Sequence, residues 1–218
     1  MIHPLEMAQT RSLCYHCFLN EASCICHDIA IVESPLKVVL LQHIRERHKA
    51  IGTEKIVRLS IPGAKTYTGI KFQNQKDLTA LLTDQTQQGY LLYPCPEAII
   101  ADQVQLNNNR QNFVVAIDGT WPHANRIYRE NPLLKNLIPL TLNTQYTSNY
   151  RIRTQPNSLC LSTVEAVVLC LEALEHTPGK YQSLLKTFDR MIDKQCQFIP
   201  EEFLKNRKRF RKVLKNDS

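Results

Sequence analysis

The chain has 218 residues, of which 43% are hydrophobic and 22% are charged, and its 27 Lys and Arg against 20 Asp and Glu give a formal charge of +7. This composition supports a sizeable core and excludes a disordered, collagen-like or membrane protein. Seven of the bases and one acid lie in residues 203–218. The positive charge is therefore concentrated near the C-terminus, and the rest of the chain is almost neutral.

Apolar runs such as Val38–Leu41 and Val114–Ile117 have the length of a strand, and no apolar run in the sequence approaches the roughly 18–20 residues of a bilayer helix. The first 30 residues contain no basic region followed by an apolar one, so we expect no signal peptide and no membrane partner. A cytoplasmic protein is expected. In that compartment cysteines are more often thiols or metal ligands than disulfides.

Four of the eight cysteines fall within thirteen residues: Cys14, Cys17, Cys24 and Cys26. Their spacing, C-x2-C-x6-C-x-C, lets the backbone turn around one ion, as the four sulfur ligands of a tetrahedral zinc require. His16 or His27 offers a substitute ligand, and four free thiols are the alternative interpretation. No ligand position is left open for catalysis, so we expect a structural zinc knuckle within residues 1–30.

Short buried strands alternate with helical patterns along the rest of the chain. Strands are expected at residues 36–42, 89–93, 113–117 and 137–142. Helices are expected at residues 54–60, 77–87, 122–129, 163–176 and 181–198. This alternation predicts an α/β fold with a mainly parallel sheet flanked by helices. We assign this domain to residues 31–200 and regard residues 201–218 as a basic C-terminal tail.

The strand expected at 113–117 leads directly into Asp118-Gly-Thr-Trp121. Ligands of open parallel sheets bind where the strands end, so Asp118 is a candidate functional carboxylate. Gly119 permits a close backbone approach, Thr120 offers a hydroxyl, and Trp121 offers a flat ring for stacking on a base. The alternative interpretation is that Asp118 caps the following helix and that Trp121 belongs to the core.

A capping box is predicted at Ser162-Thr-Val-Glu165, where each of the two terminal side chains accepts a hydrogen bond from the other residue's backbone N–H. Glu165 is a second candidate carboxylate, although its position in the capping box favours a structural role. Arg151 and Arg153 precede this segment. They either bind a cofactor carboxylate or an RNA phosphate, or are solvated charges.

The tail places apolar side chains near one helical face of residues 201–215 and bases elsewhere. Such a helix can dock by its apolar stripe and present cations to phosphates. A solvated helix end without function and a helix on a membrane surface are the alternatives.

Together these segments resemble the DTW-domain family, the tRNA-uridine aminocarboxypropyltransferases. Asp118-Gly-Thr-Trp121 matches the D-x-T-W signature of the family, and the cysteine cluster is similar to its zinc knuckle. The resemblance extends over residues 14–175, because three more segments agree in order and spacing: Gln42–Glu46 followed by Gly52-Thr53, Leu92–Pro94, and Leu161–Ala166. Cys95 and Gly52 depart from the family pattern in two loops.

The resemblance implies transfer of the 3-amino-3-carboxypropyl group of S-adenosylmethionine to N3 of a tRNA uridine, with release of methylthioadenosine. It also implies a SPOUT-like fold with a C-terminal trefoil knot, a feature that rests on the resemblance only. Asp118 is then expected to act as the general base or to orient the uracil. A zinc-containing RNA-binding module without catalysis and a SPOUT-type RNA methyltransferase are the alternatives.

The same resemblance implies roles for individual residues. Cofactor binding is expected at Tyr93, Pro94, Cys95, Asp118, Gly119, Thr120, Trp121, Leu161, Ser162, Thr163 and Glu165. Binding of the tRNA substrate is expected at His43, Glu46, Arg151, Arg153 and, in the tail, Arg207, Lys208, Arg209 and Arg211. No obligate protein partner is expected, and the sequence does not decide between a monomer and a homodimer.

Overall fold

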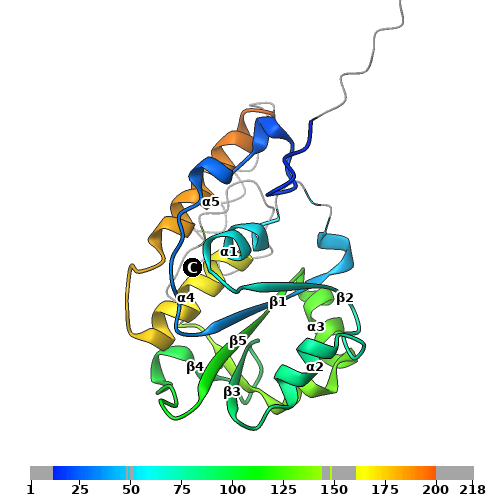
Figure 1. Ribbon diagram of the computed structural model, residues 1–218, viewed down its shortest axis with the longest axis vertical. Coiled ribbons are helices and arrows are strands. Elements are labelled where there is room, and N and C mark those ends of the chain that lie inside the picture. The colour runs from blue at the N-terminus through cyan, green and yellow to red at the C-terminus, as the bar shows by residue number, and fades with distance from the viewer. Residues whose placement is uncertain (1–11, 48, 50–51, 144–147, 149–160, 200–218) are drawn as a thin grey trace, which may run out of the picture.

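The computed structural model describes residues 12–47, 49, 52–143, 148 and 161–199. In these residues six strands form one sheet in the order β2-β1-β5-β3-β6-β4, and every neighbouring pair is parallel. Helices cover both faces of this sheet (Figure 1). The predicted α/β class with a parallel sheet is therefore confirmed.

The observed elements follow the predicted order. The strands are β1 (Lys37–His43), β2 (Lys65–Gly69), β3 (Gln87–Leu92), β4 (Ile99–Ile100), β5 (Gln111–Asp118) and β6 (Ile138–Thr141). The α-helices are α1 (Glu54–Ser60), α2 (Lys76–Thr83), α3 (Trp121–Glu130), α4 (Thr163–Glu175) and α5 (Gln182–Cys196). The short 3-10 helices are η1 (Glu21–Ser23), η2 (Cys26–Asp28), η3 (Ile44–Glu46), η4 (Ala101–Gln103) and η5 (Pro132–Asn136).

Three elements differ from the sequence-based expectation. Strands β2 and β4 are not predicted, because both lie at the edges of the sheet and neither contains a fully buried residue. Helix α2 ends at Thr83, four residues early. The Asp84 carboxylate accepts hydrogen bonds from the backbone and hydroxyl of Thr86 and from the Gln87 side chain, which favours a turn over a further helical turn.

The central strands alternate their side chains between two hydrophobic clusters. Val114 and Ala116 of β5 pack with helices α1, α4 and α5, whereas Phe113 and Val115 face α2 and α3. Both faces of β5 are buried, which explains why this strand is a continuous apolar run in the sequence. Gly89 of β3 is required by the same packing, since a Cβ atom there would overlap the Phe113 ring.

Two predicted features fall outside the described residues. The connection between β6 and α4 passes through residues 144–147 and 149–160, so the trefoil knot stays a prediction. The basic tail also lies outside the described part of the chain, which ends at Ile199.

Candidate active site and metal centre

The carboxyl ends of the three central strands, β1, β5 and β3, lie next to one another. We use the term sheet edge below for this C-terminal end of the central strands. Because β1 and β3 flank β5 in parallel register, Gln42 lies opposite Asp118, and Leu92 lies opposite Ala116. The segments that follow β1, β3 and β5 therefore begin side by side. These segments hold most of the described residues for which the sequence predicts ligand binding.

Asp118 is the last residue of β5 and is only 7% exposed. Its Oδ2 accepts a hydrogen bond of 3.0 Å from Gln42 Nε2, and its Oδ1 accepts one of 2.5 Å from the hydroxyl of Thr163. The strand register and the start of α4 thus fix the orientation of the carboxylate. The residue that caps α3 is Thr120, so the alternative of Asp118 as the helix cap is wrong.

Polar contacts continue from Asp118 to the next strand. Gln42 Oε1 accepts from the Thr68 hydroxyl at 3.1 Å, and Glu54 Oε2 accepts from the Thr66 hydroxyl at 3.3 Å. Glu54 is 5% exposed. Burial raises its pKa, and the negative charge of Asp118 raises it further. Two buried carboxyl groups therefore influence each other at this edge of the sheet.

Lys55 follows Glu54 in α1 and is 6% exposed. Burial lowers its pKa, while the negative charges of Glu54, Cys17 and Asp118 act in the opposite direction. The Lys55 ammonium is thus within electrostatic reach of both the sheet edge and the cysteine cluster.

His43 ends β1 and stacks on His123 of α3, with ring centroids 3.8 Å apart and an angle of 4° between the planes. Its Nδ1 accepts from the backbone N–H of Arg45, so Nε2 carries the proton of the neutral ring. This Nε2 is buried and has no hydrogen-bond partner within the described part of the chain. Burial and the neighbouring His123 both lower the pKa of His43, which favours the neutral form.

Glu46 connects this pair of rings to the preceding loop. Its carboxylate lies 3.3 Å from His123 Nδ1 and 2.6 Å from the Lys49 ammonium. Gly119 packs closely against both residues, since a Cβ atom there would lie 3.0 Å from the His123 Cβ and 3.5 Å from the His43 Cβ. A side chain at position 119 would therefore require His123 to shift by a few tenths of an ångström.

Trp121 begins α3 and is 52% exposed. The interpretation of Trp121 as part of the core is therefore wrong. Tyr93, by contrast, stacks on Tyr128 with ring centroids 4.5 Å apart, and its backbone N–H donates to the Leu140 carbonyl.

Pro94 and Cys95 follow Tyr93 past the end of β3. Burial, together with Glu97, raises the pKa of the Cys95 thiol. The structure places this loop at the same end of the sheet as Asp118, since β3 runs parallel to β5.

The predicted capping box at the start of α4 is present. Glu165 is 1% exposed, and its carboxylate accepts hydrogen bonds from the backbone and hydroxyl of Ser162 and from the hydroxyl of Ser148. The position of Glu165 in a capping box is thus confirmed. Leu161 immediately precedes the box. The predicted tRNA-binding residues Arg151, Arg153, Arg207, Lys208, Arg209 and Arg211 lie outside the described residues.

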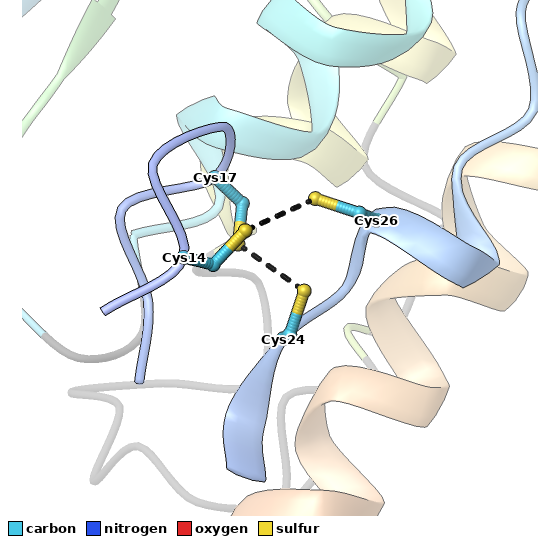
Figure 2. A group of neighbouring side chains, drawn as sticks. All are labelled: Cys14, Cys17, Cys24 and Cys26. Carbon is cyan, nitrogen blue, oxygen red and sulfur yellow. Dashed lines mark hydrogen bonds between the residues drawn. The ribbon is translucent and has the colours of Figure 1, made fainter. Parts of the chain in front are cut away.

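The sulfur atoms of Cys14, Cys17, Cys24 and Cys26 all lie within 4.8 Å of one another (Figure 2). The Cys14–Cys26 and Cys17–Cys24 pairs are each 3.7 Å apart. Four sulfurs at the usual Zn–S distance of about 2.3 Å form a tetrahedron with edges of about 3.8 Å, so the four cysteines fit a tetrahedral metal ion. His16 is a neighbour of this set, with Nδ1 3.4 Å from the Cys26 sulfur.

The sulfurs differ in acidity. Hydrogen bonds from the backbone of Cys17 and His16 lower the pKa of Cys14 to about 6, whereas burial and the neighbouring sulfurs raise the pKa of Cys26. Four thiolates at this distance repel one another, and a bound divalent cation removes that repulsion.

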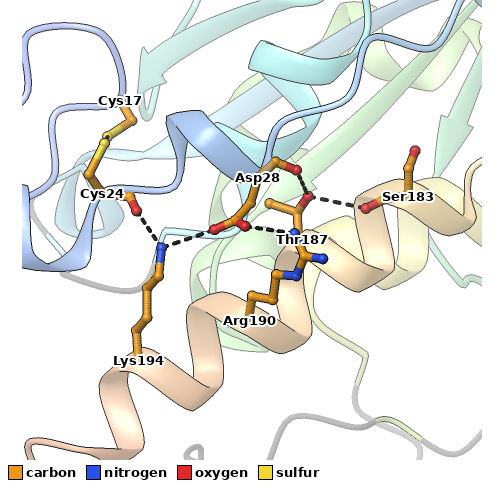
Figure 3. A network of polar contacts seen from close by, with 7 residues as sticks. All are labelled: Cys17, Cys24, Asp28, Ser183, Thr187, Arg190 and Lys194. Atoms are coloured by element: carbon orange, nitrogen blue, oxygen red, sulfur yellow. Dashed lines mark hydrogen bonds and ion pairs between the residues drawn. The ribbon is translucent and has the colours of Figure 1, made fainter.

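Helix α5 holds the cysteine segment against the body of the protein (Figure 3). The Asp28 carboxylate lies 2.7 Å from Arg190 and 2.9 Å from Lys194, and Lys194 also donates to the Cys24 carbonyl at 2.7 Å. The Thr187 hydroxyl donates to the Asp28 carbonyl. Cys17 and Ile25 are fully buried in the main core, so this segment is packed as part of the molecule.

Several residues of the sheet edge are not predicted from the sequence: Gln42, Glu54, Lys55, Thr68 and His123. Gln42 is the one with a usable signal, because a polar residue at the end of a buried apolar strand lies where parallel strands bind ligands. The others become recognisable only through the strand register and the packing of α1 and α3.

No helix in the described ranges combines the length and the apolar character needed to cross a membrane. The family model of the DTW domain matches residues 11–196. No solved structure matched the chain.

Similar proteins were found among characterised sequences. The chain is 34% identical over 185 residues to the tRNA-uridine aminocarboxypropyltransferase 2 of Drosophila melanogaster, covering 81% of this chain and 72% of the relative. It is 27% identical over 201 residues to the protein of the same name from Macaca fascicularis, covering 89% and 67%. Against the tRNA-uridine aminocarboxypropyltransferase A of Arabidopsis thaliana the identity is 22% over 218 residues, covering 87% and 83%.

Proposed function

The chain belongs to the DTW domain family, and on that premise we propose that it is a tRNA-uridine 3-amino-3-carboxypropyltransferase. It uses S-adenosylmethionine as the donor, modifies N3 of a tRNA uridine and releases methylthioadenosine. The names of its relatives support the reaction class. The observation that carries the proposal is Asp118, a buried carboxylate in the family signature, held where β5 ends by hydrogen bonds from Gln42 and Thr163.

Asp118 has the chemistry that the acceptor base needs. Uridine N3 carries a weakly acidic imide proton and becomes a good nucleophile only when that proton leaves, which a positioned carboxylate promotes. Bound S-adenosylmethionine supplies a carbon activated by its sulfonium, so that the N3–C bond forms as the C–S bond breaks. Asp118 accepts the N3 proton, or orients the imide by hydrogen bonding, while Gln42 and Thr163 hold the carboxylate in place.

Other residues of the sheet edge fit roles in binding. The exposed ring of Trp121 offers a stacking face for a base or for the adenine of the donor. The Nε2–H of His43 is a buried donor without a partner in the described structure, which suits a carbonyl or carboxylate oxygen of a substrate. Tyr93, Pro94, Cys95 and the residues around Ser162 complete the proposed donor site. Glu46 contacts the His123 ring, which stacks on His43, and so helps to hold His43 in position.

The four cysteines are proposed to hold a structural zinc ion. Their spacing in space fits Zn–S geometry, and a full set of protein ligands stabilises a fold rather than activating a water molecule. In the same proposal Arg151, Arg153 and the basic tail contact the tRNA backbone. The protein acts in the cytoplasm. Residues 1–30, 31–200 and 201–218 form the zinc knuckle, the catalytic domain and the tail.

The proposal is tested by incubating the protein with tRNA and S-adenosylmethionine, followed by mass spectrometry of the tRNA nucleosides and of the small-molecule product. We expect 3-(3-amino-3-carboxypropyl)uridine and methylthioadenosine. Release of S-adenosylhomocysteine would instead identify a methyltransferase. Binding of tRNA without any change in its nucleosides, and without heat of binding for S-adenosylmethionine, would identify an RNA-binding module.

A further inference from the structure

The turn of the cysteine segment exposes two aromatic rings. Tyr15 is 88% exposed and Phe18 is 57% exposed. The turn itself is tightly held, because the Phe18 N–H donates to the Cys14 carbonyl at 2.8 Å and the Cys14 N–H donates to the Leu19 carbonyl at 2.8 Å. Two large rings are thus presented to solvent from a short and rigid loop.

The backbone conformation of Phe18 is unusual for a residue with a large side chain. Its φ of 56° lies in the left-handed region, which favours glycine and disfavours a bulky side chain. A phenylalanine at such a position would be explained by burial of its side chain, but Phe18 is an exposed residue. Neither local backbone preference nor core packing accounts for the residue, which points to a contact outside the chain.

The turn is fixed relative to the proposed active site. Asp28 and the Cys24 carbonyl are bound by Lys194 of α5 (Figure 3). On the other side, Cys17 is buried in the main core together with Ile56 and Val57 of α1, the helix whose first residue, Glu54, belongs to the polar network near Asp118. The knuckle and the Asp118 site therefore adjoin the same helix.

Charge indicates how such a partner would be held. Residues 12–33 contain no Lys or Arg, so this segment offers no strong cation for phosphate groups. The bases of the chain are concentrated instead in residues 203–218, shortly after α5. Exposed aromatic side chains in one segment and bases in another match the division found in single-strand binding proteins, in which rings stack on bases and cations follow the backbone.

We propose that Tyr15 and Phe18 form a stacking surface for unpaired nucleotides of the tRNA substrate. This inference rests on the proposed function. Uridine N3 takes part in Watson–Crick pairing, so a uridine modified at N3 must be unpaired when it reacts. RNA recognition commonly targets such unpaired regions, whose bases are free to stack on aromatic side chains. Neighbouring unpaired bases then lie on the two rings while the target uridine enters the Asp118 site.

The test compares Tyr15→Ala and Phe18→Ala with the wild-type chain and with Ile31→Ala, an exposed apolar control that is 63% accessible. The dissociation constant for unfractionated tRNA is measured at several salt concentrations, with metal content determined for each variant. For each of the two alanine variants we expect about ten-fold weaker binding. The salt slope, which is the change in the logarithm of the dissociation constant with the logarithm of the salt concentration, should stay unchanged. For Ile31→Ala we expect binding no more than two-fold weaker. Tyr15→Phe, which keeps the ring, is expected to bind like wild type.

A contrasting variant truncated after Pro200 removes the basic tail, and its salt slope is expected to flatten. Unchanged affinity of both ring variants would overturn the proposal. A flattened salt slope in the ring variants would also overturn it, as would a shift in oligomeric state seen by sedimentation, which would assign the rings to a protein interface. Binding that depends on the rings in a protein without transferase activity would overturn the proposed function alone.

Discussion

The cysteine site and the Asp118 site both adjoin α1 but are assembled in different ways. The four sulfur ligands come from thirteen consecutive residues. The Asp118 network draws its side chains from β1, β2, β5, α1 and the start of α4. One site is a local turn that a metal ion can complete, and the other exists only when distant strands adopt their register.

This difference predicts that substitutions at the two sites affect stability and activity differently. A metal site concentrates its stabilisation in a few bonds, so the loss of one ligand removes most of it. The sheet-edge network is supported by the main core, so a polar substitution there changes the chemistry before it changes the fold. The four predictions below test this contrast.

The largest effect is expected for Asp118→Ala. Loss of a positioned carboxylate is expected to reduce the transfer rate by about 10³-fold, within the range of general acid–base catalysis. The exposed Asp102 provides a matched control, and Asp102→Ala is expected to retain the wild-type rate. Rates are measured by nucleoside mass spectrometry, and folding by circular dichroism together with metal content. A folded Asp118→Ala enzyme with wild-type activity would exclude the catalytic role.

Cys17→Ser is expected to act on stability instead. Cys17 is both a proposed zinc ligand and a fully buried core residue, so the variant loses the metal ion and about 3 kcal/mol of unfolding free energy. Thermal melting with metal analysis measures both quantities, and buried Cys170→Ser, outside the cluster, separates metal loss from the burial of a hydroxyl. Full metal content in Cys17→Ser would show that Cys17 is not a ligand.

The two sites also differ in how far the sequence predicts them. The cysteine spacing shows the ligand set directly, because all four ligands are close in the chain. Asp118 is predictable because the apolar strand β5 leads into it. Gln42, Glu54 and His123 are not predictable in this way, since their roles depend on which strands become neighbours. No local sequence pattern indicates the strand order β2-β1-β5.

The same reasoning applies to the fold. Strand β5 is predictable because both of its faces are buried, and α4 because its capping box is visible in the sequence. The edge strand β2 has mixed burial and no strong local signal. Its place beside β1 nevertheless shapes the proposed active site, because β2 supplies the hydroxyls of Thr66 and Thr68 to the polar network.

A smaller effect is expected for Asp28→Asn, which weakens the clamp between the cysteine segment and α5. Burial acts to raise the pKa of Asp28, but hydrogen bonds from Lys194 and Arg190 lower it below the usual value. Stabilisation by a carboxylate of this kind is present above its unfolded pKa and is lost as the pH falls through the folded value.

We therefore expect Asp28→Asn to lose about 1 kcal/mol at neutral pH, a modest value because Arg190 is largely exposed. The difference from wild type should shrink in acid. Denaturant unfolding at neutral and at acidic pH measures this difference in unfolding free energy. At neutral pH we expect the variant to retain its bound metal. A difference that stays constant across this range would show that the charge of Asp28 does not stabilise the clamp.

The smallest effect is expected for Glu54→Gln, which keeps an acceptor for the Thr66 hydroxyl but removes an ionisable group. Burial, and then Asp118, raise the pKa of Glu54 in the folded protein. The folded state therefore binds this proton more tightly than the unfolded state. The stability of the wild-type protein falls as the pH rises from the unfolded pKa of Glu54 to its folded pKa.

Glu54→Gln lacks this penalty, so its stability relative to wild type should increase with pH across that window and then level off. A variant at the exposed Glu33 corrects for the general effect of removing one negative charge. Metal content should remain unchanged, because Glu54 belongs to the sheet-edge network and not to the cysteine site. If the difference in unfolding free energy between Glu54→Gln and wild type instead stays constant at every pH, the pKa of Glu54 is not raised in the folded protein, and neither burial nor the charge of Asp118 acts on this carboxyl group.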